Sequence, residues 1–294
     1  MAEPILQLSA DELSSALEGV DPVDLLAEEL ADGTTSAPEE VRLTPWRGRV
    51  GATRRPMAEP LLLEDLRTGE RCVLPASGLR ACRAAALTGL AATAFLAPGE
   101  ATAAVLSSSF ATEPHLMVIA RYLRRVGRLT IYSASDRSES AIEPRVLDHL
   151  DLAGVRVHRT TSVTDAVLAA DLVVAAATSG RLRIDSLAKG AVVVNATNQD
   201  LPDDLVNAVD GLYVDDAALI EENRNRYFVD AHLRGRRRID ADLGQVLTGA
   251  RAGRTELDHV LLVELLSANA LDPTLASVLH RAALERGLGG QLFE

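Results

Sequence analysis

The chain has 294 residues, which at about 150 residues per domain predicts two domains. Its content of 47% hydrophobic and 24% charged residues excludes collagen-like, coiled-coil and disordered chains. The formal net charge of −12 is concentrated at the start of the chain, because residues 1–40 hold eleven acids and no Lys or Arg, and Lys189 is the only lysine.

Membrane, metal and nucleic-acid partners are not expected. No apolar run reaches the roughly 18 residues of a membrane span, and the first forty residues lack the basic segment of a signal peptide, so we expect a cytoplasmic protein. Cys72, Cys82 and the six scattered histidines match no zinc-binding spacing. An acidic chain with 3% aromatic residues is a poor candidate for binding nucleic acid.

The N-terminal third reads as helices followed by a loop and a hairpin. Residues 10–31 predict two short helices, with Ser9 as an N-cap and Pro22 in a first turn. The stretch 33–60 is rich in Gly, Pro, Thr and Arg and predicts a loop with at most short strands. Two strands are predicted next, at residues 61–63 and 72–74, joined by a turn at 67–70. An Ala/Leu-rich helix is predicted at 77–96.

From residue 102 onward, short apolar runs alternate with helical stretches. This alternation predicts a doubly wound parallel sheet. Ser162 and Asp165 form a capping pattern before one of these helices, and a final helix is expected near 272–286. The predicted strands are 102–106, 129–132, 155–158, 172–176, 191–195 and 211–214.

A cluster of arginines surrounds the only tryptophan, Trp46, with no acid among them. It comprises Arg42, Arg47, Arg49, Arg54 and Arg55. A solvated loop is the ordinary explanation of such a charge run. Its single sign and the embedded tryptophan favour a binding surface for an anionic partner instead.

The first strand of the predicted sheet lacks the glycine-rich turn that brings a dinucleotide's pyrophosphate onto a helix N-terminus. It runs into Ser107, Ser108 and Ser109, and no glycine lies between Gly99 and Gly127. Three hydroxyls could hold a phosphate, but their Cβ atoms obstruct close approach and Glu113 adds negative charge. After the second strand, Asp136 could contact an adenosine ribose or could cap a helix. No cofactor is therefore expected.

Seven segments, in this order along the chain, resemble the ornithine cyclodeaminase/mu-crystallin family. They are Leu63–Glu70, Leu79–Ala86, Lys189–Ala196, Asp200–Pro202, Val214–Asp216, Leu243–Gly249 and Glu285–Gly289. The resemblance implies a Rossmann-like domain (97–264) inserted in an α+β substrate and dimerisation domain built from 1–96 plus 265–294. It also implies a homodimer, and in active members an NAD or NADP cofactor.

Two family residues can be carried over position by position. Arg83 matches the arginine that grips the substrate carboxylate, although a helix-surface arginine is equally expected. Asp200 matches the acid that handles the substrate amine, although an aspartate that stabilises a turn is nearly as expected. The family's lysine falls in the segment 49–60, which holds no lysine here, and arginine does not release a proton near neutral pH.

Two hypotheses follow from the absence of the glycine-rich turn and of the family's lysine. The first is a non-catalytic binding protein for an acidic peptide, such as the leader of a precursor presented to partner enzymes, by analogy with crocagin-type ribosomal-peptide pathways. Trp46, Arg47, Arg54 and Arg55 would contact that peptide. The second is a working NAD(P)-dependent cyclodeaminase or imine reductase acting on a small amino acid. In that case Arg83 and Asp200 would carry the chemistry, and Ser107–Ser109 and Asp136 would hold the cofactor.

Overall fold

The computed structural model describes residues 5–32, 40–53, 57–107, 112–134, 142–176, 182–266 and 269–292. The chain divides into two compact units. Unit 1 comprises residues 1–86 and 269–294, and unit 2 comprises residues 87–268. The long helix α3 (Ala76–Phe95) contributes its first half to unit 1 and its second half to unit 2.

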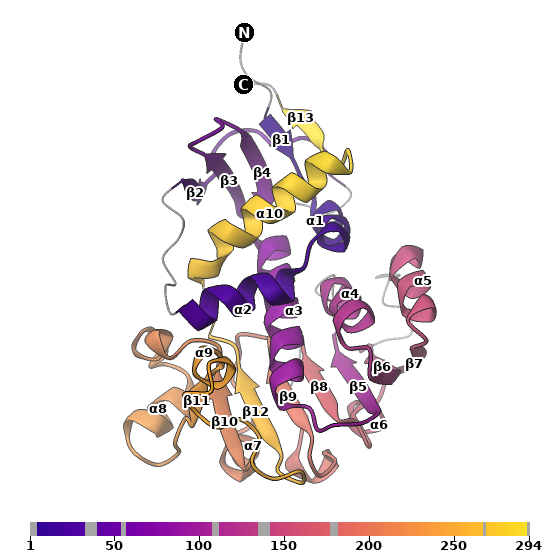
Figure 1. The fold of residues 1–294 in the computed structure, drawn as a ribbon, viewed down its shortest axis with the longest axis vertical. Coiled ribbons are helices and arrows are strands. Elements are labelled where there is room, and N and C mark those ends of the chain that lie inside the picture. The colour runs from indigo at the N-terminus through magenta and orange to yellow at the C-terminus, as the bar shows by residue number, and fades with distance from the viewer. Residues whose placement is uncertain are drawn as a thin grey trace. The chain divides into compact units, whose positions relative to one another are not determined.

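Unit 1 is built on a five-stranded sheet with the order β13-β1-β4-β3-β2. Helix α10 packs against β2 and β3, and α1 packs against α10, so helices lie over one face of this sheet (Figure 1). The strands are β1 (Ile5–Gln7), β2 (Val41–Pro45), β3 (Pro60–Asp65), β4 (Arg71–Pro75) and β13 (Gly290–Leu292). The helices are α1 (Ala10–Ala16), η1 (Leu17–Gly19), α2 (Pro22–Asp32), η5 (Asn269–Leu271) and α10 (Asp272–Glu285).

Local sequence signals explain the elements of unit 1. The Ser9 side chain accepts a hydrogen bond from the Glu12 N–H, and the Glu12 carboxylate accepts one from the Ser9 N–H, so the predicted N-cap is a full capping box. The predicted hairpin is confirmed as β3 and β4. Its turn is held by Asp65, whose Oδ1 accepts the N–H groups of Arg67 and Thr68, and Gly69 adopts the left-handed conformation that the turn requires.

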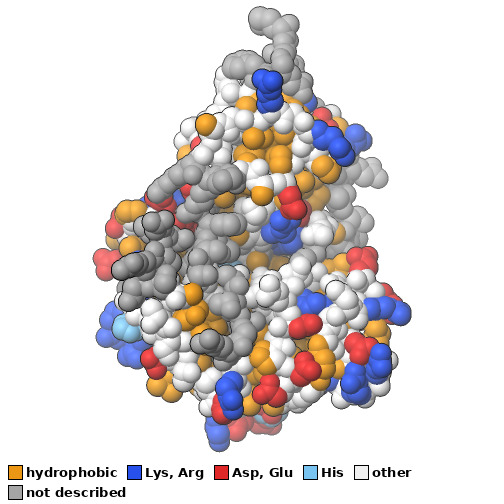
Figure 2. Space-filling view, turned by 180° about the vertical axis from the view of Figure 1, so that it is seen from behind, with side chains coloured by type: hydrophobic (Ala, Val, Ile, Leu, Met, Phe, Trp, Pro, Cys, Tyr) orange, Lys and Arg blue, Asp and Glu red, His pale blue; other side chains and the backbone are white. Residues whose placement is uncertain are grey.

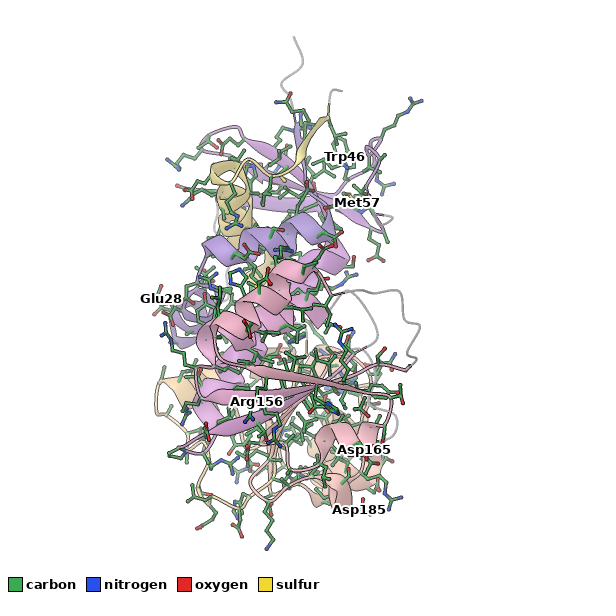
Figure 3. The ribbon with its side chains drawn as sticks, turned by 90° about the vertical axis from the view of Figure 1, so that its right-hand side faces the viewer. Glu28, Trp46, Met57, Arg156, Asp165 and Asp185 are labelled. Carbon is green, nitrogen blue, oxygen red and sulfur yellow. The ribbon has the colours of Figure 1, made fainter. Side chains whose placement is uncertain are left out.

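The other face of the unit 1 sheet carries an apolar cluster. Ile5, Leu62 and Val73 are buried there, and Trp46, Met57 and Leu292 pack against them while staying partly exposed. Trp46 and Met57 lie near each other beside the sheet in Figure 3. Figure 2 shows hydrophobic side chains gathered on the face of the molecule that is turned away in Figure 1.

Unit 2 contains an eight-stranded sheet with the order β11-β10-β12-β9-β8-β5-β6-β7, and all its described pairings are parallel. The α/β, Rossmann-like fold class is thereby confirmed. The strands are β5 (Ala101–Leu106), β6 (Val126–Tyr132), β7 (Arg156–Thr160), β8 (Leu172–Ala175), β9 (Val192–Asn195), β10 (Gly211–Val214), β11 (Ala241–Asp242) and β12 (Leu261–Glu264).

Helices lie on both faces of this sheet (Figure 3). The α-helices are α4 (Thr112–Tyr122), α5 (Pro144–Leu152), α6 (Val163–Val167), α7 (Asp203–Ala208), α8 (Tyr227–Leu233) and α9 (Leu243–Leu247). Short 3-10 helices are η2 (Ile184–Ser186), η3 (Ala217–Leu219) and η4 (Glu221–Asn223). Ser162 caps α6 by accepting the Asp165 N–H, as the sequence predicts. No helix in the described ranges is long and apolar enough to cross a membrane.

Strand β12 is absent from the sequence-based prediction, and the structure corrects this. It lies between β9 and β10 and is fully buried. Its apolar residues 261–263 are typical of a buried parallel strand, but the strand ends on Glu264, a residue type that is almost never fully buried without a partner. The partners of Glu264 are described below.

Candidate functional site

The carboxyl edge of the unit 2 sheet is where ligands bind in doubly wound folds, beside the point where the strand order reverses. Here β5 has β6 on one side and β8 on the other, and β5 is followed by α4. The candidate site is therefore formed by the ends of β5, β9, β10 and β12 and by the loops that follow them.

Polar side chains lie at the end of β5 and in the first turn of α4. Ser107 is buried, and its Oγ accepts a hydrogen bond from the Thr112 Oγ1 at 2.5 Å. Glu113, in the first turn of α4, is 4% exposed, and its Oε1 accepts the Glu143 N–H at 3.3 Å. A carboxylate thus occupies the positive end of α4. Ser108, Ser109 and Asp136 lie outside the described residues.

His115 lies two residues further along α4. It is 1% exposed, and burial lowers its pKa to about 4, so it is neutral at physiological pH. Its Nδ1 has no hydrogen-bond partner in the part of the chain that the structure describes. The start of α4 therefore presents a neutral ring and an internal carboxylate.

A buried polar network closes the carboxyl ends of β9 and β12. Asn195 and Glu264 lie in register on these adjacent strands, and neither is exposed. The Glu264 Oε2 accepts hydrogen bonds from the Asn195 Nδ2 and from the Arg226 Nη2, each at 2.8 Å. The Asn195 amide also donates to the Gln199 carbonyl and so holds the loop that follows β9. The network fixes the loop that carries Asp200.

Asp200 is oriented by the residues around the start of α8. Its Oδ1 accepts hydrogen bonds from the Arg226 Nε at 2.9 Å and from the Tyr227 N–H at 3.1 Å. Its side chain is 40% exposed, and Oδ2 has no hydrogen bond among the described residues. One carboxylate oxygen of Asp200 is therefore engaged within the protein, and the other can accept a hydrogen bond from a ligand.

Burial raises the pKa of Glu264 to about 8, and the nearby Arg226 guanidinium only partly opposes this. The Glu264 Oε1 has no hydrogen-bond partner in the described ranges, whereas Oε2 has two. We assign the proton to Oε1 for that reason. The Arg226 guanidinium thus lies between the neutral Glu264 acid and the Asp200 side chain.

Arg83 lies in unit 1, on α3, and is 3% exposed. Its Nη1 donates to the Oδ1 of Asp272 at the start of α10. Burial raises the pKa of Asp272, and the Arg83 charge opposes that rise. A helix-surface position for Arg83 is thus wrong: Arg83 does face a carboxylate, and this carboxylate belongs to the chain itself.

The described part of the arginine segment follows the exposed edge of the unit 1 sheet. Arg42 on β2 and Arg47 after it are both exposed. Trp46 is half-buried against the apolar cluster, and its Nε1 donates to the Arg49 carbonyl at 3.2 Å. A Cβ at Gly48 would lie 2.2 Å from the Trp46 ring, so a larger residue there would displace that ring. Arg54 and Arg55 lie outside the described residues.

Sequence reasoning missed Arg226 and Glu264. Neither belongs to a recognisable motif, and the strand that ends in Glu264 was not predicted. The one available signal is an acidic residue directly after an apolar run, which in a parallel sheet lies at the carboxyl edge. Within the described residues, no group of His, Cys, Asp and Glu side chains could hold a metal ion.

Comparison with known proteins supplies the family. Residues 47–286 match the ornithine cyclodeaminase/mu-crystallin family. Among curated proteins, a Δ1-pyrroline-2-carboxylate reductase of Bacillus thuringiensis is 23% identical over 241 residues, covering 79% of this chain and 73% of that protein.

Solved structures share the fold over nearly the whole chain. CmnK has a TM-score of 0.73 at 23% identity, covering 99% of this chain and 98% of that one. The Δ1-pyrroline-2-carboxylate reductase of Thermococcus litoralis, solved with NADH and L-proline, has a TM-score of 0.69 at 15% identity, covering 98% of this chain and 100% of that one. At these identities the structures establish the fold alone.

Proposed function

The chain belongs to the ornithine cyclodeaminase/mu-crystallin family, and we propose that it is a non-catalytic binding member that presents a peptide to partner enzymes. The observation that carries this proposal is the buried carboxylate of Glu113 at the start of α4. A dinucleotide's pyrophosphate would approach this helix end and would meet that negative charge in a turn without glycine. These residues do not fit the cofactor that the family's enzymes use.

Thermal unfolding with NAD, NADH, NADP and NADPH tests the first half of the proposal. A ligand at a hundred times its dissociation constant adds about 2.7 kcal/mol to the free energy of unfolding, which is readily seen as a rise in Tm. We expect no rise at millimolar dinucleotide. A rise with any of the four that exceeds the rise with adenosine at the same concentration would overturn the proposal.

The peptide site we propose is the outer edge of β2, which pairs only with β3 in the described sheet. The Trp46 N–H donates to the Pro60 carbonyl, and the Leu66 N–H to the Glu40 carbonyl, so even-numbered residues of β2 face β3. Val41 and Leu43 therefore direct their N–H groups outward, where an extended peptide could pair with them. Arg42 and Arg47 flank this edge and favour an acidic peptide.

A fluorescein-labelled octapeptide of alternating Glu and Val serves as the probe. Exposed charge contacts contribute about 0.2–1 kcal/mol each, so Arg42→Glu with Arg47→Glu should weaken binding about tenfold and reduce its salt dependence. Arg124→Glu with Arg159→Glu, two exposed positions in unit 2, changes the net charge equally and should leave binding unchanged. Equal loss in both double variants would refute a site at β2.

A reductase acting on a small cyclic amino or imino acid is the second candidate, and the geometry of Asp200 favours it. One oxygen of this carboxylate is fixed by Arg226 and Tyr227, and the other can accept a hydrogen bond from a ligand amine. The Bacillus relative is a reductase of that kind. Oxidation of NADPH with Δ1-pyrroline-2-carboxylate, abolished by Asp200→Asn, would establish this candidate in place of the first.

A further inference from the structure

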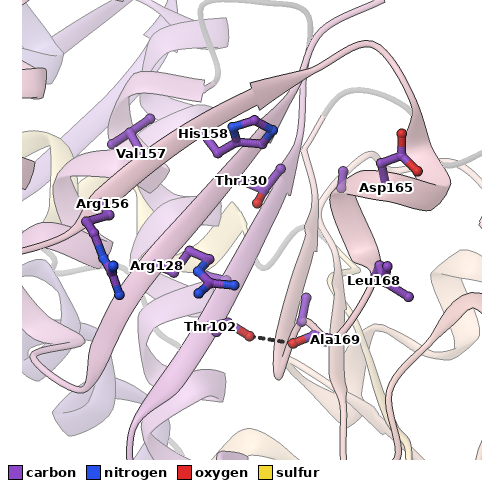
Figure 4. Close-up of a pocket in the computed structure, with 12 residues that line it drawn as sticks. Thr102, Arg128, Thr130, Arg156, Val157, His158, Asp165, Leu168 and Ala169 are labelled. Carbon is purple, nitrogen blue, oxygen red and sulfur yellow. Dashed lines mark hydrogen bonds between the residues drawn. The ribbon is translucent and has the colours of Figure 1, made fainter.

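A second pocket lies in unit 2, away from the carboxyl edge of the sheet. It has a volume of about 430 Å³ and opens on the face of β5, β6 and β7 against which α6 packs, toward the amino ends of these strands (Figure 4). This size is within the range of small-molecule sites. Its polar lining consists of Thr102, Arg128, Thr130, Arg156, His158 and Asp165.

Two arginines lie side by side in this pocket. Arg128 on β6 is in register with Arg156 on β7, so both side chains leave the same face of the sheet. Both are exposed, and neither forms an ion pair with a carboxylate in the described ranges. Like charges opposite each other on neighbouring strands destabilise a sheet, so an anion bound between the two guanidinium groups would stabilise this pair.

The rest of the pocket suits a small anion with an organic part. Thr130 and His158 form the next pair in register on the same strands and extend the polar wall. Asp165 is the one acid in the lining, against two arginines. On the opposite side, the Thr102 Oγ1 donates to the Ala169 carbonyl at 2.6 Å and holds Ala169 at a positive φ of 58°. This contact fixes the rim beside exposed Leu168.

We propose that this pocket binds a small molecule through a phosphate monoester. Two guanidinium groups supply two planar sets of N–H donors and two positive charges, which match the charge and the oxygens of a phosphate dianion. Thr130 can add a hydroxyl donor, and the small and apolar lining residues leave room for the organic part of the ligand. The site is independent of the peptide edge and of the dinucleotide position.

Isothermal titration calorimetry on the full chain, at constant ionic strength, tests the proposal with three probes: AMP, inorganic phosphate and malonate. We expect AMP to bind, with a dissociation constant at least about tenfold higher in Arg128→Gln with Arg156→Gln. Arg124→Gln with Arg159→Gln is the matched control. Arg159 is on the same strand but does not line the pocket, and Arg124 precedes β6 outside it.

The outcomes separate the possible ligands. Tighter binding of AMP than of inorganic phosphate supports an organic phosphate, and equal binding assigns the site to free phosphate. Malonate binding as tightly as AMP would overturn the phosphate assignment. Absence of binding by every probe, or equal weakening in the two double variants, would overturn the site. Without any ligand, the pocket double variant should have a Tm no lower than that of the native protein, because it relieves the repulsion between the arginines.

Discussion

The side chain of Glu264 lies at the end of a buried strand, and the folded state favours its protonated form. Its pKa of about 8 in the folded protein exceeds the ordinary value of 4.5 because burial disfavours the charge. Between these two pH values the folded state binds a proton that the unfolded state has released. The free energy of unfolding therefore falls as the pH rises through this window.

The prediction is a pH slope of at most about 1.4 kcal/mol per pH unit between pH 5 and pH 8, attributable to this one group. Glu264→Gln keeps the shape of the protonated acid and should remove that part of the slope. Urea unfolding at pH 6, 7 and 8 measures it, with the exposed Glu256→Gln as the control. Identical slopes for the native protein and Glu264→Gln would show that Glu264 is ionised in the fold.

A second prediction at this scale concerns the buried ion pair of Arg83 and Asp272. Removing one partner of a buried pair costs about 3–5 kcal/mol, because the other charge is left without compensation. Asp272→Asn keeps an acceptor, so we expect a loss of about 3 kcal/mol in the free energy of unfolding. The comparison is Asp185→Asn, whose exposed pair with Arg183 should have no measurable effect on the urea midpoint. Equal midpoints for both variants would contradict a stabilising pair.

Contacts between residues close in sequence can be predicted from local patterns, and contacts between distant residues cannot. The Ser9 cap and the Asp65 turn depend on neighbours within three residues, so local patterns predict them. The partners of Arg226 and Glu264 are 26 to 69 residues apart in the chain. No local pattern encodes such contacts. The resemblance to the family singles out Asp200 in the sequence, whereas the residues that orient it are close to it only in three dimensions.

Strand β2 forms the edge of the unit 1 sheet, and its outward N–H groups can be tested with proline. The N–H of Leu43 faces outward and forms no bond to β3, so proline there removes a donor that a bound peptide would use, together with a half-buried leucine side chain. Leu43→Pro should abolish binding of the Glu-Val octapeptide, whereas Leu43→Ala, which keeps the N–H, should retain it at a similar Tm. Thr44→Pro removes an N–H directed at β3 and should lower the Tm. Peptide binding retained by Leu43→Pro would exclude strand addition at this edge.

The sequence predicts where most strands of unit 2 lie along the chain, but it does not predict which strands pair in the sheet. The apolar runs of β5 to β10 are periodic signals, and their ends agree with the structure to within three residues. The short strands β1, β11 and β13 have two or three residues each, too few for a pattern. Their existence depends on pairing with distant strands, as Ile5 does with Leu292.

For the whole molecule, we expect a homodimer. The unit 1 sheet has helices on one face, and on the other Trp46, Met57 and Leu292 cover the buried cluster of Ile5, Leu62 and Val73 but stay partly exposed themselves. A second copy placing the same face against it would bury the exposed parts of Trp46, Met57 and Leu292. Light scattering at micromolar concentration should give twice 31.3 kDa. A dominant species of 31.3 kDa would contradict this, and Met57→Glu, at a partly exposed position on this face, should shift the dimer toward that mass.

The construction of unit 1 from both ends of the chain sets an order for folding during synthesis. β1 needs β13, and Arg83 needs Asp272, 189 residues later, whereas unit 2 is one continuous stretch. At about 5–20 residues per second, the ribosome takes on the order of ten seconds or more to make the intervening chain. Throughout that interval the apolar strands at the N-terminus lack their last partners. The nascent chain therefore exposes unpaired apolar strands of unit 1 for as long as unit 2, including its central strand β12, is being made.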